Sequence, residues 1–184
     1  MTKNSLRRHF LAQRLDLSPQ QWQSQSLALC QVLQAWPVFQ RAQTVLAYFS
    51  VRQEPDLSSL FTLPKTWGFP VCHQSQLLWF PWQLGDRLFL GPYGIWQPTV
   101  EQESLLPSQI DLILVPCLAG DRQGYRLGYG GGYYDRLLAQ PQWCQLPTLG
   151  IVFAASYGQP LPHDPWDQPL QGFCTECGYY ESEN

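Results

Sequence analysis

The residues best suited to chemistry lie between Arg126 and Leu138, in the sequence RLGYGGGYYDRLL. Four glycines fall within the five positions 128–132, and two tyrosines and an aspartate follow. Consecutive glycines let backbone N–H groups face a ligand, and the start of a following helix adds a positive dipole end, which suits a phosphate. Arg126 and Arg136 could add charge-assisted contacts. The segment is therefore either a phosphate-binding loop or a tight turn with its tyrosines packed inward.

This segment does not match the sequence motifs of the common nucleotide-binding loops. A dinucleotide-binding fingerprint needs a further glycine at Tyr133 or Asp135, and a P-loop needs Gly-Lys-Ser/Thr, whereas the last lysine is Lys65. Protein-kinase signatures are also absent. Asp135 is either an acid that complements the helix dipole or a Mg²⁺ ligand beside a phosphate site.

Charged residues elsewhere also have two interpretations each. Glu54 follows a β-rich segment in a polar turn, where an acid is usually only solvated. Asp167 stands in a proline-rich tail and could simply cap a turn. Lys3 and Arg7 are four residues apart and share one helical face, which is ordinarily an exposed basic face. The three histidines are scattered, and we assign them no role.

The elements that must position these residues alternate between strands and helices. Ser18-Pro19 is a good helix start, and the apolar spacing that follows predicts an amphipathic helix ended by Pro37. We expect strands at 44–50, 67–72, 76–82, 111–115 and 149–153, a short helix at 57–61 and another over 133–140. This order predicts a three-layer α/β/α domain with a mostly parallel sheet. In such sheets ligands bind beyond the carboxyl ends of the strands, where the loop carrying Glu54 and the glycine segment would meet.

Length and composition indicate one soluble domain spanning residues 1–184. The net charge is −3 and there are only two lysines, so nucleic acid is an unsuitable partner. No apolar stretch suits a signal peptide or a membrane span, and we expect a cytoplasmic monomer. Four of the six cysteines look like packing residues. Cys174 and Cys177 have CxxC spacing, but no partner motif completes a zinc site.

Five segments together resemble the 5-formyltetrahydrofolate cyclo-ligase family, also called 5,10-methenyltetrahydrofolate synthetases. They are KNSLR at 3–7, YFSVRQEPD at 48–56, YGIWQP at 93–98, DLILVPCLAGDRQGYRLGYGGGYYDRLL at 111–138 and LPHDPWDQPLQGFCTE at 161–176. The resemblance implies an α/β fold similar to the NagB/RpiA/CoA-transferase-like domains. It also implies an ATP- and Mg²⁺-dependent closure of 5-formyltetrahydrofolate to 5,10-methenyltetrahydrofolate, in which the formyl oxygen is phosphorylated, N10 attacks, and ADP and phosphate are released.

The same resemblance assigns the site residues. ATP would be bound by Lys3, Asn4, Ser5, Leu6, Arg7, Arg126, Leu127, Gly128, Tyr129, Gly130, Gly131, Gly132, Tyr133 and Tyr134. The folate would lie against Phe49, Glu54, Tyr129, Gly130, Gly131, Gly132 and Tyr133. Arg126, Tyr129 and Tyr133 would act on the reacting groups. Asp135 and Asp167 would hold Mg²⁺, and Asp164 remains an alternative to Asp167.

The sequence departs from the family pattern at one site position, and two other functions are alternatives. Some family members carry arginine at position 129, so phosphate neutralisation here would depend more on Arg126, Arg7 and Mg²⁺. A non-catalytic folate- or nucleotide-binding protein on the same scaffold is the alternative function. A phosphosugar isomerase of related fold would need a general base and a ring-opening acid that the sequence does not offer.

Overall fold

The computed structural model describes residues 2–91 and 94–183, so Tyr93, the first residue of the 93–98 segment, lies outside the described residues. The helices are α1 (Lys3–Leu15), α2 (Pro19–Ala35), α3 (Pro37–Arg41) and α4 (Tyr133–Leu138), with 3₁₀ turns η1 (Ser58–Leu60), η3 (Pro107–Gln109) and η4 (Ala154–Ser156). The main strands are β1 (Thr44–Leu46), β2 (Thr66–His73), β3 (Gln76–Pro81), β6 (Leu112–Pro116), β9 (Thr148–Ile151), β10 (Gly172–Thr175) and β11 (Gly178–Glu181). Two small hairpins pair β4 (Leu88–Leu90) with β5 (Trp96–Pro98), and β7 (Ala119–Gly120) with β8 (Arg126–Leu127).

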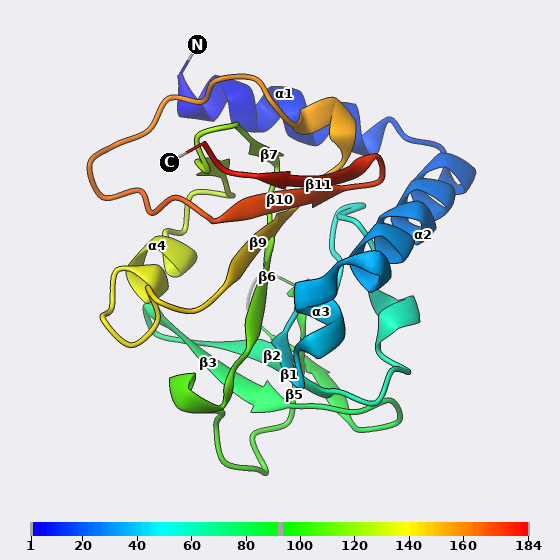
Figure 1. Cartoon of the computed structure of the whole chain (residues 1–184), viewed down its shortest axis with the longest axis vertical. Helices are drawn as coiled ribbons and strands as arrows, with labels where there is room; N and C mark the ends of the chain where they lie inside the picture. The colour runs from blue at the N-terminus through cyan, green and yellow to red at the C-terminus, as the bar shows by residue number, and fades with distance from the viewer. Residues whose placement is uncertain (1, 92–93, 184) are drawn as a thin grey trace.

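The main strands form one seven-stranded sheet in the order β11-β10-β9-β6-β1-β2-β3 (Figure 1). Neighbours among the five inner strands are parallel, and the edge strands β3 and β11 are antiparallel to theirs. Inner parallel strands are covered on both faces, which explains why β6 and β9 are apolar and buried along most of their length. The predicted α/β fold with a mostly parallel sheet is confirmed.

Side chains of the inner strands alternate between two apolar clusters. Leu112 and Leu114 of β6 join the cluster beneath α2 and α3, which supply Leu29, Leu33 and Phe39. The intervening β6 residues Ile113 and Val115 join the opposite cluster, together with Leu137 and Leu138 of α4 and Trp143. This period of two follows from strand geometry and gives the sheet a helical layer on each face.

Several predicted boundaries were wrong. The strand expected at 44–50 ends at Leu46, and after a last bond from the Ala47 N–H to the Gly68 carbonyl the chain enters the loop that carries Glu54. The helix expected over 133–140 has only six residues, and the short helix at 57–61 is the 3₁₀ turn η1. The hairpin β10–β11 was not expected, because Gly172 and Gly178 interrupt its pattern.

The CxxC pair belongs to that C-terminal hairpin. Cys174 is buried in β10, Cys177 is exposed in the turn, and all six cysteines are free. Among the described residues there is no group of three His, Cys, Asp or Glu side chains that could hold a metal. The same residues include no helix suited to spanning a membrane.

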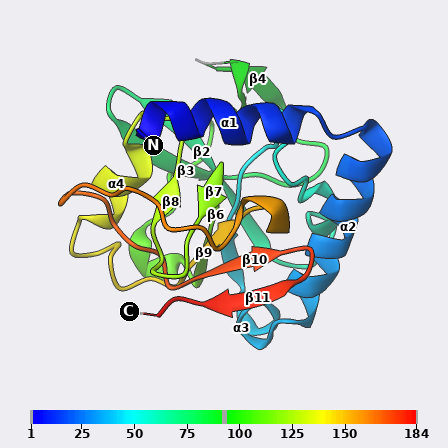
Figure 2. The same cartoon turned by 90° about the horizontal axis from the view of Figure 1, so that it is seen from above.

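Helix α1 lies across the end of the domain, above the β7–β8 hairpin and beside the irregular tail that leads to β10 (Figures 1 and 2). Its apolar side chains Leu6 and Phe10 pack against Leu127 and Leu161. This contact places the polar face of α1 at the carboxyl ends of β1 and β6, where ligands of parallel sheets bind.

Candidate functional site

The basic face of α1 docks onto the glycine loop, Gly128–Gly132, and onto the tail. Lys3 Nζ lies 2.6 Å from Asp164 Oδ2 and also pairs with Asp167. Arg7 Nε donates to the carbonyl of Gly128 at 2.9 Å, and its Nη1 donates to Asn4 Oδ1 at 2.6 Å. The interpretation of Lys3 and Arg7 as a merely exposed face is therefore wrong.

The glycine loop takes conformations that require glycine at two positions. Gly130 has a φ of 98°, and Gly132, the N-cap of α4, has a φ of 64°. Both values lie in the left-handed region, which side chains rarely adopt. Because α4 is so short, its dipole gives little basis for phosphate binding, and a phosphate here would have to be held by side-chain cations and loop N–H groups.

Arg126 ties the loop to α4 and to the tail. Its side chain is 5 % exposed, and Nη2 lies 2.6 Å from Asp135 Oδ1. Its Nη1 donates to the carbonyl of Gln168 at 2.5 Å, while the Gln168 N–H donates to Asp135 Oδ1 at 3.2 Å. The Tyr134 ring lies 5.9 Å from the guanidinium. These bonds bring Asp135 close to Asp167, the residue before Gln168.

The tail aspartates form a small charged turn around Lys3. The Asp164 N–H donates to Asp167 Oδ2 at 2.7 Å. Burial alone would raise the pKa of Asp167, but hydrogen bonds from Lys3 and from the Asp164 N–H outweigh it and lower that pKa. Burial alone would lower the pKa of Lys3, but its hydrogen bonds to Asp164 and Asp167 raise it.

Asp135 and Asp167 fit the chemistry of a Mg²⁺ site. Mg²⁺ is usually held by one or two carboxylates together with waters and phosphate oxygens, so a cage of three protein acids is not required. Each carboxylate is paired with a cation through one oxygen, Asp135 Oδ1 with Arg126 and Asp167 Oδ2 with Lys3, so a Mg²⁺ ion would bind in competition with these cations or through the other carboxylate oxygens. The two acids alone therefore offer an incomplete set of oxygen ligands that phosphates would complete.

Glu54 is not a solvated loop acid. Glu54 is only 3 % exposed, and its Oε2 accepts from the Val51 N–H at 3.2 Å. Its carbonyl accepts from Trp22 Nε1 at 2.8 Å and from Ser50 Oγ at 2.7 Å. Burial raises the pKa of Glu54, while the charge of Arg14 and hydrogen bonds from Val51 N–H and Tyr129 oppose the rise.

The two tyrosines expected at the reaction centre point to different partners. Tyr129 is 44 % exposed, but its hydroxyl accepts from Arg14 and lies beside the Glu54 carboxylate. Burial and the charge of Glu54 raise the pKa of Tyr129 to about 12. Tyr133 donates to the carbonyl of Gln74 at 3.2 Å, in the β2–β3 turn. The loop thus faces Glu54 on one side and the β2–β3 hairpin on the other.

Other predicted ligand contacts are constrained by packing. Leu6 and Leu127 are buried in the core, so they could meet a nucleotide only through backbone atoms. Arg136 donates to the carbonyl of Ser75 at 2.9 Å and lies over the Tyr133 ring, which directs its charge toward the β2–β3 turn. Asn4 and Ser5 remain exposed or half-buried on α1.

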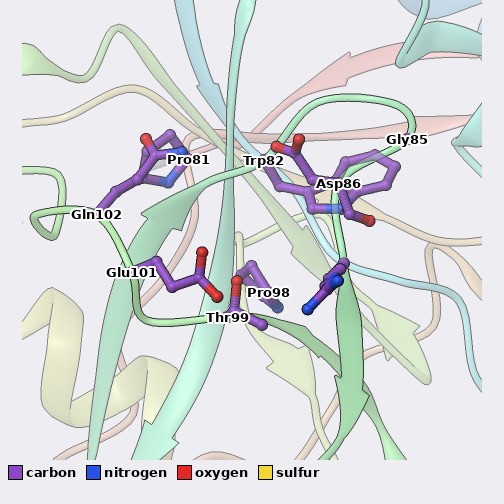
Figure 3. Close-up of a pocket in the computed structure, with 9 residues that line it drawn as sticks. Pro81, Trp82, Gly85, Asp86, Pro98, Thr99, Glu101 and Gln102 are labelled. Carbon is purple, nitrogen blue, oxygen red and sulfur yellow. The ribbon is translucent and has the colours of Figure 1, made fainter.

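Phe49 belongs to an aromatic cluster rather than to the glycine loop. Its ring stacks on Phe69 at 4.1 Å and meets Trp82 edge-on at 5.2 Å. A cavity of about 430 Å³ lies against Trp82 (Figure 3). It is lined by Pro81, Trp82, Gly85, Asp86, Arg87, Pro98, Thr99, Glu101 and Gln102. None of the predicted site residues lines this cavity, although Phe49 contacts Trp82, which does.

Arg14 is the residue that sequence reasoning missed. It is 5 % exposed, and its guanidinium bonds to the loops that carry Glu54 and Tyr129. The available signal was its spacing, because Arg14 follows Arg7 by seven residues and shares its helical face. Spacing could not show which distant loops it meets.

Comparison with known proteins identifies the family. Residues 1–176 match the sequence model of the 5-formyltetrahydrofolate cyclo-ligase family. The chain belongs to this family. It is 28 % identical over 176 residues to the 5-formyltetrahydrofolate cyclo-ligase of Escherichia coli K12, a match covering 91 % of this chain and 97 % of that protein. The cyclo-ligase of Haemophilus influenzae is 30 % identical over 71 % of this chain and 74 % of its own length.

Comparison with solved structures supports the same family assignment. The NMR structure of Aquifex aeolicus 5,10-methenyltetrahydrofolate synthetase superposes with a TM-score of 0.87 and 31 % identity, covering 100 % of this chain and 94 % of that one. The resemblance identified from the sequence is therefore confirmed, and with it the assignment of the chain to the cyclo-ligase family of enzymes.

Proposed function

We propose that the protein converts 5-formyltetrahydrofolate to 5,10-methenyltetrahydrofolate with Mg²⁺ and with conversion of ATP to ADP and phosphate. The observation that carries this proposal is the position of the segment Arg126–Asp135. On one side it bonds to Arg7 of α1 and to the backbone of Gln168 in the tail, and on the other its Tyr129 hydroxyl accepts from Arg14 and lies beside Glu54. One short loop can thereby meet both substrates.

The phosphates of ATP would bind on the side of α1. Lys3, Arg7 and Arg126 supply three positive charges within bonding distance of the glycine loop or the tail. Asp135 and Asp167 would hold Mg²⁺, which when bound supplies positive charge to the transferring phosphoryl group. Lys3 and Arg126 hold these carboxylates in place and can share their hydrogen bonds with phosphate oxygens.

The folate would bind on the side of Glu54 and Phe49. A carboxylate accepts hydrogen bonds from the amino group and ring N–H groups of a pterin, and an aromatic ring can lie against its face. The Tyr129 hydroxyl lies beside the Glu54 carboxylate in the ligand-free protein. A pterin that reaches this carboxylate would therefore meet Tyr129 as well, which links folate binding to the position of the loop.

The chemistry explains the need for ATP. A formyl amide carbon is a poor electrophile, and its oxygen is a poor leaving group. Transfer of the γ-phosphoryl group to that oxygen releases ADP and gives an imidate phosphate, which N10 attacks; the C–O bond then breaks and phosphate leaves with the oxygen. The protein's contribution is to align the two substrates and to stabilise charge, as in other phosphoryl transfers.

Formation of the methenyl product tests the proposal. Purified protein is mixed with 5-formyltetrahydrofolate, ATP and Mg²⁺, and the ultraviolet absorbance of the product is followed against reactions that lack ATP or protein. We expect product only in the complete mixture. Absence of product, with both ligands still bound, would instead support the non-catalytic binding protein.

A further inference from the structure

Arg14 joins three segments that are far apart in the sequence. Its Nε donates to the carbonyl of Arg52 at 3.0 Å, in the loop after β1. Its Nη1 donates to the carbonyl of Cys117 at 3.4 Å, just after β6. Its Nη2 donates to the hydroxyl of Tyr129 in the glycine loop. The guanidinium is therefore shared between the two loops expected to hold the substrates and the end of a central strand.

The contact with Tyr129 has a defined direction. Arginine has donors only, so the phenol oxygen must accept from Arg14. The phenol hydrogen is then available to the Glu54 carboxylate, which lies beside the Tyr129 hydroxyl. The Tyr129 hydroxyl therefore stands between the Arg14 guanidinium, to which it is hydrogen-bonded, and the carboxylate proposed to bind the pterin.

The turn before Glu54 gives a second reason for this arrangement. Arg52 and Gln53 have φ values of 50° and 55°, so two consecutive residues with side chains are left-handed. Such residues persist only where the surroundings hold them, and they cluster at functional sites. The bond from Arg14 to the Arg52 carbonyl and one from Gln53 Nε2 to the Leu17 carbonyl at 3.3 Å hold the turn.

The titratable groups around Glu54 come from several elements. The titratable groups that face it are Arg14 of α1, Arg52 of its own loop, Tyr48 after β1, Cys117 after β6, Tyr129 of the glycine loop and Tyr134 of α4. Two of these are cations, and Arg52 is exposed, so solvent screens it. Arg14 is buried and is the stronger of the two influences on Glu54.

We propose that Arg14 is a positioning residue that ties the Glu54 loop to the glycine loop and so holds the Glu54 carboxylate, beside its own positive charge, aimed at the folate. The role in folate binding rests on the proposed function, whereas the link between Arg14 and Glu54 does not. In this role Arg14 acts through Glu54 and Tyr129 and does not touch the reacting atoms.

The first test measures Glu54 in the ligand-free protein. Glutamate carboxyl carbons are ¹³C-labelled, the Glu54 signal is identified by its loss in Glu54→Gln, and its titration midpoint is measured by NMR. We expect Arg14→Gln to raise the midpoint by about one pH unit or more, because an opposite charge is lost. Arg14→Lys should lie between, and Arg8→Gln, an exposed arginine of the same helix, should match the wild type. An unchanged midpoint in folded Arg14→Gln would overturn the link.

The second test measures folate affinity across pH. Binding of 5-formyltetrahydrofolate is titrated calorimetrically between about pH 5 and pH 8. In Arg14→Gln we expect affinity to fall about tenfold or more at the acid end and to recover toward the wild-type value as Glu54 ionises. A purely structural role would weaken binding by the same factor at every pH, and that result would overturn the positioning role.

Two controls keep both tests decisive. Near-ultraviolet circular dichroism verifies that each variant is folded, and Tyr129→Phe removes the intermediate hydroxyl from a half-exposed ring if Arg14→Gln does not fold. We expect Tyr129→Phe to raise the Glu54 midpoint too, and no rise would contradict a link that runs through the Tyr129 hydroxyl. If the wild type fails to bind folate while the midpoint still moves with Arg14, the proposed function fails and the link between Arg14 and Glu54 stands.

Discussion

Two alanine substitutions two residues apart separate the architectural role of the glycine loop from phosphate binding. Gly130 has a φ of 98°, and a Cβ there would lie 3.2 Å from the guanidinium carbon of Arg7. Gly128 has no left-handed φ, and a Cβ there would meet nothing within 4 Å. Gly130→Ala therefore strains the ligand-free fold, whereas Gly128→Ala adds a methyl group that matters only when a ligand approaches the backbone.

The magnitudes follow from these geometries. A side chain in a sparsely populated conformation costs about 1–3 kcal/mol, so Gly130→Ala should lower the Tm by roughly 2–12 °C in a chain of this size. Gly128→Ala should leave the Tm unchanged or raise it slightly, since it lowers the entropy of the unfolded chain by the equivalent of ~0.4–1 kcal/mol. If the loop cradles phosphate, the same variant should raise KM for ATP about tenfold or more, as expected when a charged hydrogen bond is lost.

The assay combines thermal unfolding, followed by circular dichroism, with initial rates of methenyl product formation at varied ATP. Gly128→Ala is the informative variant, because its fold is predicted to be intact. Wild-type KM and kcat in this variant would refute phosphate binding by the backbone at Gly128 and leave the loop as a tight turn.

Three further predictions concern the surrounding charges and turns. Asp135→Asn leaves buried Arg126 without its carboxylate and should lower the free energy of unfolding by about 2–3 kcal/mol. This loss is smaller than for a fully buried pair because the Asp135 side chain is 26 % exposed. A loss of less than ~1 kcal/mol in a urea titration would contradict this prediction. The pKa of Lys3 is raised above 10.5 and that of Asp167 is lowered below 3.8, so their ion pair should stabilise the fold at every pH between these two values. This stability should be lost as the pH rises through the pKa of Lys3 or falls through the pKa of Asp167. A stability difference between wild type and Lys3→Met that varied between about pH 5 and pH 9 would contradict this prediction. Gln74 has a φ of 53° in the β2–β3 turn, so Gln74→Asn should stabilise by up to about 1 kcal/mol, and a lower Tm would contradict the left-handed assignment.

Local patterns predicted the layers of the fold. The buried run at 111–115 and the apolar run at 149–153 became β6 and β9, because inner parallel strands need apolar residues on both faces. Ser18-Pro19 began α2, with the Ser18 side chain accepting from the Gln21 N–H. The C-terminal hairpin and the short length of α4 depended instead on tertiary pairing, which local patterns do not contain.

The sequence was enough to predict which segments form the site, but not which of their residues contact one another. Glycine spacing located the loop at 128–132, and the left-handed values at Gly130 and Gly132 give its physical reason. The burial of Glu54 and the role of Arg14 could not be read from the sequence, because they depend on contacts between residues 38 to 115 positions apart. The ion pairs of Lys3, which join residues 161 and 164 positions apart, are of the same kind.

The central claim is that the loop from Arg126 to Asp135 brings the γ-phosphate of ATP to the formyl oxygen. The most direct measurement uses 5-formyltetrahydrofolate labelled with ¹⁸O in the formyl group, with mass spectrometry of the inorganic phosphate formed in a single turnover. The account predicts that the label appears in phosphate, because the formyl carbon–oxygen bond breaks after phosphorylation. Unlabelled phosphate formed together with methenyl product would contradict it.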